Sequence, residues 1–387
     1  MKNCRILLLF CLVFPQVLKA QIYSGKVSDN DSGFPIINAN VFLAGTLTGT
    51  TTNKSGRFSF NSKGNHSVPI VISFVGYKTK IISPDILVND SVIRLEKEIQ
   101  NINEINVKAG KSGWSRNKMI LVFRDEFLGT SFNAKACKIK NEEDIYLFYN
   151  NETKTLHARS KKPLLIENKQ LGYEVNYSLE YFKKTEPGLQ FKGFSRFEEQ
   201  KFRNDRQKKK IEMRRRETYL GSIMHFIRFL YHQNLAGNDT VYDLATIAGI
   251  YEYHLSYQKW LSDNYTGGDL SMTSVVSKNE VNNIYPRKWE DKFQMYDDSS
   301  NYLSGKKLLI NVNGKRQICF DDTVQIVYLG NLRTSYLIPR SDTIRIFENG
   351  YYNPEKITWF GEMIKSRVGD MLPLDYEYNN SILSNKK

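Results

Sequence analysis

Apolar and polar residues alternate in short runs between residues 22 and 95, and clusters of Gly, Pro, Asn and Asp separate the runs. Alternation with a period of two is the signal of strands that bury one face, and the separating residues accept the geometry of tight turns. Strands in this number and spacing predict a small sandwich of two antiparallel sheets. The predicted strands are Ile22–Ser28, Asn40–Leu43, Gly49–Thr52, Arg57–Phe60, Val68–Val75, Tyr77–Ile82 and Ser91–Leu95.

The pattern becomes mixed after residue 113. A helix is predicted over Trp114–Leu128, and alternating runs follow it between residues 136 and 197. Apolar residues then recur at steps of three and four over residues 219–232, which predicts an amphipathic helix that faces a core. The preceding basic run, residues 202–217, is either an extension of that helix or a separate helix over the sheet. Asn313 and Gly314 predict a two-residue hairpin, with further strands after it.

These elements predict an α+β fold with two domains. Residues 21–95 form a seven-stranded β-sandwich, and residues 96–113 form a connector. Residues 114–387 form a larger, β-rich α+β domain with a central helix. A length of 387 residues agrees with this division, because chains of this length seldom fold around a single hydrophobic core.

Residues 1–20 have the composition of a secretory signal peptide. Lys2 and Arg5 precede an apolar run over residues 6–14 that is too short to span a bilayer, and Ala20 offers a cleavage point. No later segment has about 18 uninterrupted apolar residues, so no transmembrane helix is predicted after the signal. We predict that the protein is exported, either to the periplasm or to the outer membrane.

The positive charge of the chain is concentrated in one place. The formal net charge is +14, or +11 without Lys2, Arg5 and Lys19. Residues 201–216 contain nine Lys or Arg against two acidic residues, a net charge of +7. Such a field could hold phosphate-bearing lipid, lipopolysaccharide or acidic glycan, and the alternative is a solvated helix face. Export argues against nucleic acid, although charge alone would permit it. The predicted basic patch comprises Lys208, Lys209, Lys210, Arg214, Arg215 and Arg216.

The N-terminal segment also carries a motif pattern. Its fixed positions are Gly25, Lys26, Val27, Gly33, Pro35, Ala39, Asn40, Val41, Gly45, Thr46, Gly49, Thr50, Thr52, Gly56, Phe58 and the closing Ser73, Phe74, Val75, Gly76, Tyr77. This pattern resembles the carboxypeptidase-regulatory-like domain, which has a transthyretin-like fold and is frequent at the N-termini of exported proteins of the Bacteroidota. The resemblance implies an exported, non-catalytic β-sandwich. It implies no peptidase activity, because the name refers to the proteins in which the domain was found.

Several phrases of the second domain resemble the C-terminal region of a family of Bacteroidota surface or periplasmic proteins. They lie at residues 126–137, 163–173, 219–231 and 370–376, and the last reads Asp-Met-Leu-Pro-Leu-Asp-Tyr. This resemblance implies no role for any single residue.

Few residues suggest chemistry. His225 and His232 lie seven positions apart, whereas a helical pair of metal ligands is normally spaced by three or four. Ser222 lacks the flanking glycines of a nucleophile elbow. Cys137 would need a histidine from elsewhere in the chain, such as His157 or His225. We therefore predict no catalytic residue, metal or cofactor, and retain Ser222, His225 and His232 as a speculative pocket.

Two cysteines, Cys137 and Cys319, remain once the signal peptide is removed. In an oxidising compartment they could form a disulfide, or they could be two separate buried thiols.

The function expected from the sequence is a non-catalytic binding or structural role in the cell envelope, with a protein, glycan or envelope surface as the partner. The alternative is a hydrolase of peptide or glycan with a site near Ser222, His225 and Cys137.

Overall fold

The structure is a computed structural model, and it describes residues 21–62, 68–84, 86–87, 90–98, 113–186, 188–232, 293–296, 303, 308–320, 322–328 and 333–378. The chain divides into two compact units. The first lies within residues 1–105 and also takes in Phe194–Phe197, and the second comprises the remainder of residues 106–387. The division falls within the predicted connector. The predicted signal peptide lies outside the described residues.

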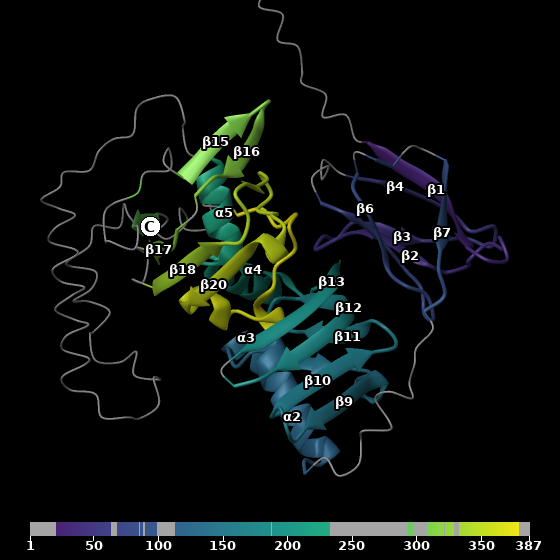
Figure 1. Cartoon of the computed structure of the whole chain (residues 1–387), viewed down its shortest axis with the longest axis horizontal. Helices are drawn as coiled ribbons and strands as arrows, with labels where there is room; N and C mark the ends of the chain where they lie inside the picture. Colours follow the sequence, from purple (N-terminus) through teal and green to yellow (C-terminus); the bar gives the residue numbers. More distant parts are fainter. Residues whose placement is uncertain are drawn as a thin grey trace, which may run out of the picture. The chain divides into compact units, whose positions relative to one another are not determined.

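The described residues of the first unit form seven strands in two small sheets (Figure 1). One sheet has the order β4-β1-β7, in which β1 pairs antiparallel with β4 and parallel with β7. The other has the order β3-β2-β5-β6 and is antiparallel throughout. The strands are β1 (Ile22–Asp29), β2 (Asn40–Leu43), β3 (Gly49–Thr51), β4 (Arg57–Asn61), β5 (Ile70–Ser73), β6 (Lys80–Ile82) and β7 (Ser91–Leu95).

The alternating pattern correctly predicted all seven strands, because their apolar residues form the core of this unit. Val27 on β1, Val41 on β2 and Ile72 on β5 have no exposed surface. The prediction was wrong at the motif Phe74–Val75–Gly76–Tyr77, which it divided between two strands. This motif is a turn, closed by a hydrogen bond from the Tyr77 N–H to the Phe74 carbonyl (3.1 Å).

The second unit begins with a six-stranded sheet and two helices. Figure 1 shows α2 lying along one face of this sheet, and ring contacts connect them. Phe123 of α2 meets Phe182 of β12 edge-on at 4.9 Å, and Phe127 meets Tyr177 edge-on at 5.0 Å. The elements are α2 (Arg116–Leu128), α3 (Phe132–Lys135), β8 (Cys137–Ile139), β9 (Ile145–Asn150), β10 (Thr155–Ser160), β11 (Leu164–Asn168), β12 (Tyr173–Lys184) and β13 (Leu189–Glu199).

The long strand β12 organises this sheet. Its beginning pairs with β11 from Tyr173 to Tyr177, and its end pairs with β10 from Phe182 to Lys184. Strand β13 also pairs with β12. A Cβ atom on Gly193 of β13 would overlap the Tyr177 ring and the Ser178 carbonyl oxygen, so the close approach of β13 to β12 requires glycine there.

Two helices follow the sheet, α4 (Asp205–Tyr219) and α5 (Ile223–Tyr231). The basic run is thus a separate helix, and Gly221, at a φ of 76°, lies in the break between the two. The apolar face of α5, including Phe226, Ile227 and Leu230, packs into a second core with residues of β14, β17 and β18. This confirms the core-facing stripe predicted for the central helix.

In the part of the chain after α5 that the structure describes, the strands form one four-stranded sheet, β14-β17-β18-β20, and one three-stranded sheet, β15-β16-β19. Asn313 and Gly314 connect β15 to β16 with positive φ values of 52° and 75°, as the hairpin prediction requires. The strands are β14 (Phe293–Tyr296), β15 (Leu309–Val312), β16 (Lys315–Ile318), β17 (Val324–Tyr328), β18 (Arg333–Pro339), β19 (Ile344–Arg345) and β20 (Ile357–Gly361). Short 3₁₀ turns occur at η1 (Glu142–Asp144), η3 (Pro354–Lys356), η4 (Glu362–Lys365) and η5 (Val368–Asp370).

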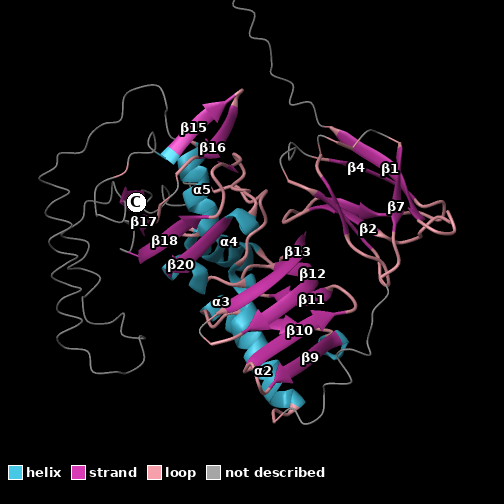
Figure 2. Ribbon diagram, viewed as in Figure 1, coloured by secondary structure: helices cyan, strands magenta, loops and turns pink. Residues whose placement is uncertain are grey.

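Figure 2 shows that strands dominate the described part of the chain and that its longer helices belong to the second unit. The fold is therefore a β-rich N-terminal region followed by a β-rich region with a few helices, as the α+β prediction states in outline.

Candidate functional site

The C-terminal segment of the described chain, residues 367–378, is bound to several elements of the second unit by polar contacts. We call it the C-terminal strap. Asp370 Oδ1 accepts hydrogen bonds from Ser131 Oγ (2.8 Å) and Asn133 Nδ2 (2.9 Å), which belong to the start of α3. Asn168 of β11 donates through Nδ2 to the Gly369 carbonyl (2.9 Å). The first half of the strap is thereby connected to α3 and to the sheet.

Arg228 of α5 holds the second half of the strap. Its Nη1 donates to the Tyr376 carbonyl (2.9 Å) and its Nη2 to the Leu374 carbonyl (3.0 Å). Its Nε donates to the Asn349 carbonyl (3.1 Å). The fixed fork of a guanidinium lets one side chain donate to three carbonyls at once.

The strap and its partners contain residues from all four phrases singled out in the second domain by the sequence analysis. Ser131 and Asn133 come from the first phrase, Asn168 from the second, Arg228 from the third and Asp370 from the last. Residues from four segments that are far apart along the chain thus meet around the strap, and their hydrogen bonds hold it in position.

Arg215, one of the predicted patch residues, lies inside the fold with 7% of its surface exposed. Its Nε donates to the Leu171 carbonyl (2.7 Å), and its Nη1 forms an ion pair with Glu199 Oε1 (2.6 Å). Its guanidinium lies 3.9 Å from the centre of the Tyr173 ring. Arg215 is therefore committed to internal contacts and is not part of a surface patch.

The other patch residues divide between partial burial and full exposure. Arg216 contacts Tyr378 of the strap at 3.3 Å, and Arg214 lies 5.3 Å from the centre of the Phe132 ring. Lys208, Lys209 and Lys210 are exposed. Sequence periodicity could have separated these residues, because Ile211, Arg215 and Tyr219 follow at the four-residue steps of the buried face.

Arg206 belongs with the exposed lysines, although the predicted patch did not include it. Arg206, Lys209 and Lys210 form no ion pair with another residue of the described chain. Lys208 lies 3.9 Å from Glu212, one turn along α4. We call Arg206, Lys209, Lys210 and Arg214 the basic face of α4.

The residues of the speculative pocket lie at the two ends of α5. Ser222 is the N-cap, and its Oγ accepts a hydrogen bond from the backbone N–H of His225 (3.1 Å). His232 is the exposed C-cap residue at the opposite end of α5. The structure therefore does not bring the three side chains together around one point.

The His225 ring is enclosed by other rings. Phe293 and Tyr328 meet it edge-on, with ring centres 4.8 and 5.7 Å away, and Nδ1 accepts a hydrogen bond from the Gly221 N–H (3.1 Å). Burial, with a smaller contribution from the charge of Arg228, lowers the pKa of His225 to about 4. His225 is a neutral packing residue at ordinary pH, and its Nδ1 is already occupied.

The two cysteines are free thiols in the structure, and no disulfide joins them. Cys319 is exposed, whereas Cys137 is partly buried, with its thiol 3.4 Å from the Asn133 carbonyl. Burial, together with the negative charge of Asp370, raises the pKa of Cys137 to about 12. A nucleophilic cysteine needs a lowered pKa, so this environment is unfavourable for the thiolate.

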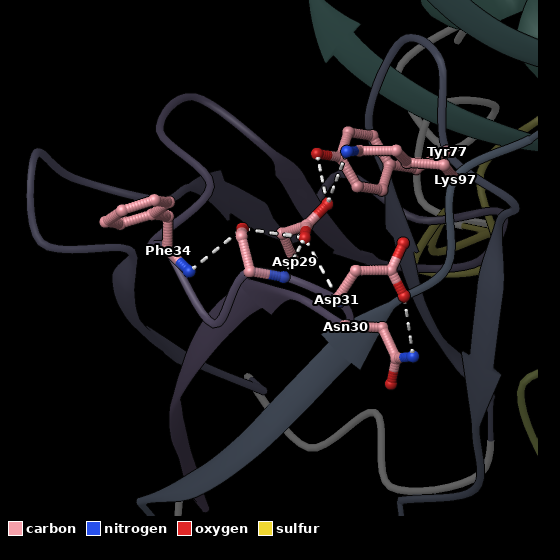
Figure 3. A network of polar contacts seen from close by, with 7 residues as sticks. Asp29, Asn30, Asp31, Phe34, Tyr77 and Lys97 are labelled. Carbon is pink, nitrogen blue, oxygen red and sulfur yellow. Dashed lines mark hydrogen bonds and ion pairs between the residues drawn. The ribbon is translucent and has the colours of Figure 1, made fainter.

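Among the described residues of the first unit, Asp29 at the end of β1 is a buried carboxylate (Figure 3). Its Oδ1 accepts hydrogen bonds from the N–H and hydroxyl of Ser32, both at 2.7 Å, and its Oδ2 accepts one from the Tyr77 hydroxyl at 2.8 Å. Lys97 forms an ion pair with the same Oδ2 at 3.7 Å. These donors, Ser32 first, hold the pKa of Asp29 well below its usual range.

This network explains part of the N-terminal motif. Tyr77, the last residue of the motif, is 48 positions from Asp29 and connects the turn after β5 to the end of β1. Asp29 itself was not singled out as a fixed position, because a single acidic residue before a turn gives no sequence signal of its partner. All four named contacts are internal, which indicates a structural role.

Among the described residues, no group of three or more His, Cys, Asp or Glu side chains is placed to hold a metal ion. Within that same part of the chain, no helix is long and apolar enough to cross a membrane.

Comparison with known proteins identifies one domain. Residues 23–107 match the family model described as the CarboxypepD_reg-like domain, which confirms the resemblance of the N-terminal segment. No curated protein matches the chain. Among solved structures, a 9R-lipoxygenase from Cyanothece PCC8801 is similar at 9% identity, over 55% of this chain and 47% of that chain, with a TM-score of 0.17. The match spans about half the length of that structure, and at this TM-score it carries no argument about fold or function.

Proposed function

With a CarboxypepD_reg-like domain at residues 23–107 as the premise, we propose that the chain is an exported cell-envelope protein whose second unit binds an acidic ligand without catalysis. In this proposal the first unit is a transthyretin-like sandwich that serves as a scaffold. The second unit supplies the binding surface, with α5 as its central helix. Residues 1–20 direct export to the periplasm or the outer membrane.

The observation that carries the binding proposal is the basic face of α4. Its exposed charges have no acidic partner among the described residues. Arg215 and Arg228, in contrast, form hydrogen bonds or ion pairs inside the second unit. A field of several like charges on one helix face attracts ligands of opposite charge, and the attraction weakens with salt. The ligand class is therefore one that bears phosphate, sulfate or carboxylate groups.

The hydrolase alternative receives no support from the contacts of its proposed residues. Ser222 is a helix cap, His225 is enclosed by rings, and the pKa of Cys137 is raised. Each of these contacts has a structural explanation.

Export is tested by fractionation of cells that express the full chain, followed by N-terminal sequencing of the mature protein. We expect the protein in the envelope fraction, with Gln21 as its first residue. Recovery of the uncut chain in the cytosol would contradict the proposal.

Ligand binding is tested by retention of the purified protein on a sulfated-dextran matrix in low salt. The variant R206Q/K209Q/K210Q should elute at clearly lower salt than the parent. The control K138Q/R159Q/K183Q removes the same charge from exposed positions on strands and should elute close to the parent. Equal shifts in the two variants would mean that net charge alone explains retention, and the basic face would lose its proposed role.

A further inference from the structure

The basic face of α4 is bordered by two exposed apolar side chains. Phe132 of α3 is 66% exposed and Met213 of α4 is 52% exposed. Phe132 adjoins the face because the Arg214 guanidinium lies 5.3 Å from the centre of its ring. Met213 adjoins it because Lys209 and Lys210 precede it by four and three positions, which places them one turn away on the same side of the helix.

The buried and exposed sides of α4 are distinct, which determines how the helix can meet a partner. Ile211, Arg215 and Tyr219 face the interior of the second unit. Arg206, Lys209 and Met213 face outward. The helix is thus anchored along one side and presents positive charge with an apolar centre along the other.

Resting on the function proposed above, we infer that the ligand of the basic face is a lipid surface that carries phosphate headgroups. The charges would meet the phosphates, and the side chains of Phe132 and Met213 would enter the boundary between headgroups and acyl chains. Lysine and arginine around aromatic and aliphatic side chains is the composition of surfaces that lie in the plane of an anionic membrane. A soluble acidic glycan would be matched by the charges and would leave both apolar side chains in water.

Two apolar side chains contribute little binding free energy, so this surface makes a reversible contact with the membrane. An anionic bilayer attracts each nearby Lys or Arg with a free energy that corresponds to about a fivefold change in affinity. Partial transfer of one aromatic and one methionine side chain out of water contributes about tenfold. Both contributions are required for useful affinity, so each can be tested by its removal.

The experiment is co-sedimentation of the full chain with vesicles of phosphatidylcholine that contain a minority of phosphatidylglycerol, with pure phosphatidylcholine vesicles alongside. We expect binding to the anionic vesicles only. R206Q/K209Q/K210Q should bind them about 100-fold more weakly, and F132S/M213S about tenfold more weakly. The matched apolar control, L121S/L165S, changes two exposed leucines of the same unit and should bind like the parent. Unchanged melting temperatures establish that all variants are folded.

Parallel measurements on the sulfated-dextran matrix separate the two proposals. Loss of vesicle binding in F132S/M213S with normal retention on the matrix supports the lipid surface. If F132S/M213S binds vesicles as well as the parent does, while the basic variant loses both activities, the ligand is an acidic polymer and the lipid inference is wrong. If the basic variant retains both activities, the proposed function fails as well. Binding to neutral vesicles as strong as to anionic ones would also overturn the inference, because charge would then play no part.

Discussion

The variant Arg215→Gln tests whether all basic residues of α4 lie on one exposed surface, or whether some of them are buried on the opposite side of the helix. Arg215 and Lys209 belong to the same helix and carry the same charge. The guanidinium of Arg215 is buried against Leu171, Glu199 and Tyr173, whereas Lys209 is exposed. A purely electrostatic description of the run predicts equal effects for the two residues, and the structure predicts very unequal ones.

The magnitude follows from the contacts that are lost. Removing one partner of a buried ion pair costs about 3–5 kcal/mol, but the Glu199 side chain is 46% exposed and regains water. A buried carbonyl left without a donor costs about 1–3 kcal/mol. This cost applies to the Leu171 carbonyl, because the Gly172 carbonyl keeps the backbone N–H of Gln200 as a donor. We expect a loss of about 3 kcal/mol in the free energy of unfolding. For a unit of this size, that loss lowers the melting temperature by about 6–12 °C.

Thermal unfolding followed by circular dichroism measures this difference, with Lys209→Gln as the control. Lys209→Gln should lie within about 0.5 kcal/mol of the parent because it removes no internal contact. Arg215→Lys should recover little of the loss, since an ammonium cannot reproduce the fork. Melting temperatures for Arg215→Gln and Lys209→Gln that agree within about 2 °C would refute the reasoning.

Three further outcomes are expected. The pKa of His225 is lowered from 6.5 to about 4, so the unfolded chain binds the proton more readily, and about 3 kcal/mol of stability is lost as pH falls from about 6.5 to about 4. Denaturant midpoints across that range should fall less steeply in His225→Gln, and parallel profiles would contradict this. Cys319 should react with iodoacetamide much faster than Cys137 in the folded protein, because the pKa of Cys137 is raised to about 12; thiol counts near zero in the denatured, unreduced protein would instead reveal a disulfide. Gly193→Ala should cost about 2–3 kcal/mol because the added methyl group overlaps the Tyr177 ring and a backbone oxygen, and an unchanged melting temperature would argue against that packing.

The elements of the fold were largely predictable from local pattern. The predicted strands Asn40–Leu43 and Ser91–Leu95 agree with β2 and β7 residue for residue, because alternation marks which side of a strand is buried. The motif Phe74–Val75–Gly76–Tyr77 was misplaced because its residues are as apolar as those of a strand. Its turn depends on a hydrogen bond between backbone groups, which composition does not reveal.

The candidate site was predictable only in part. The sequence located the charge of α4 correctly but assigned Arg215 to the surface, since a charged side chain is usually exposed. The carbonyls that accept hydrogen bonds from Arg215 belong to Leu171 and Gly172, more than 40 positions away. Arg228 and Asp370 were noted in two separate phrases, and nothing in those phrases indicated that Arg228 holds the strap to which Asp370 belongs.

By itself, the sequence determined the strands of the first unit, the buried stripe of α5 and the family of residues 23–107. Each of these depends on the periodicity of apolar residues or on the spacing of motif residues along the chain. Only the tertiary structure decided which charged side chains are exposed to water and which form internal contacts. The lysines of α4 remain in water, whereas Arg215, Arg228 and Asp29 are held by partners from distant segments. The physical reason is that the state of a polar side chain depends on the donors and acceptors that folding brings to it, and those are set by packing between elements.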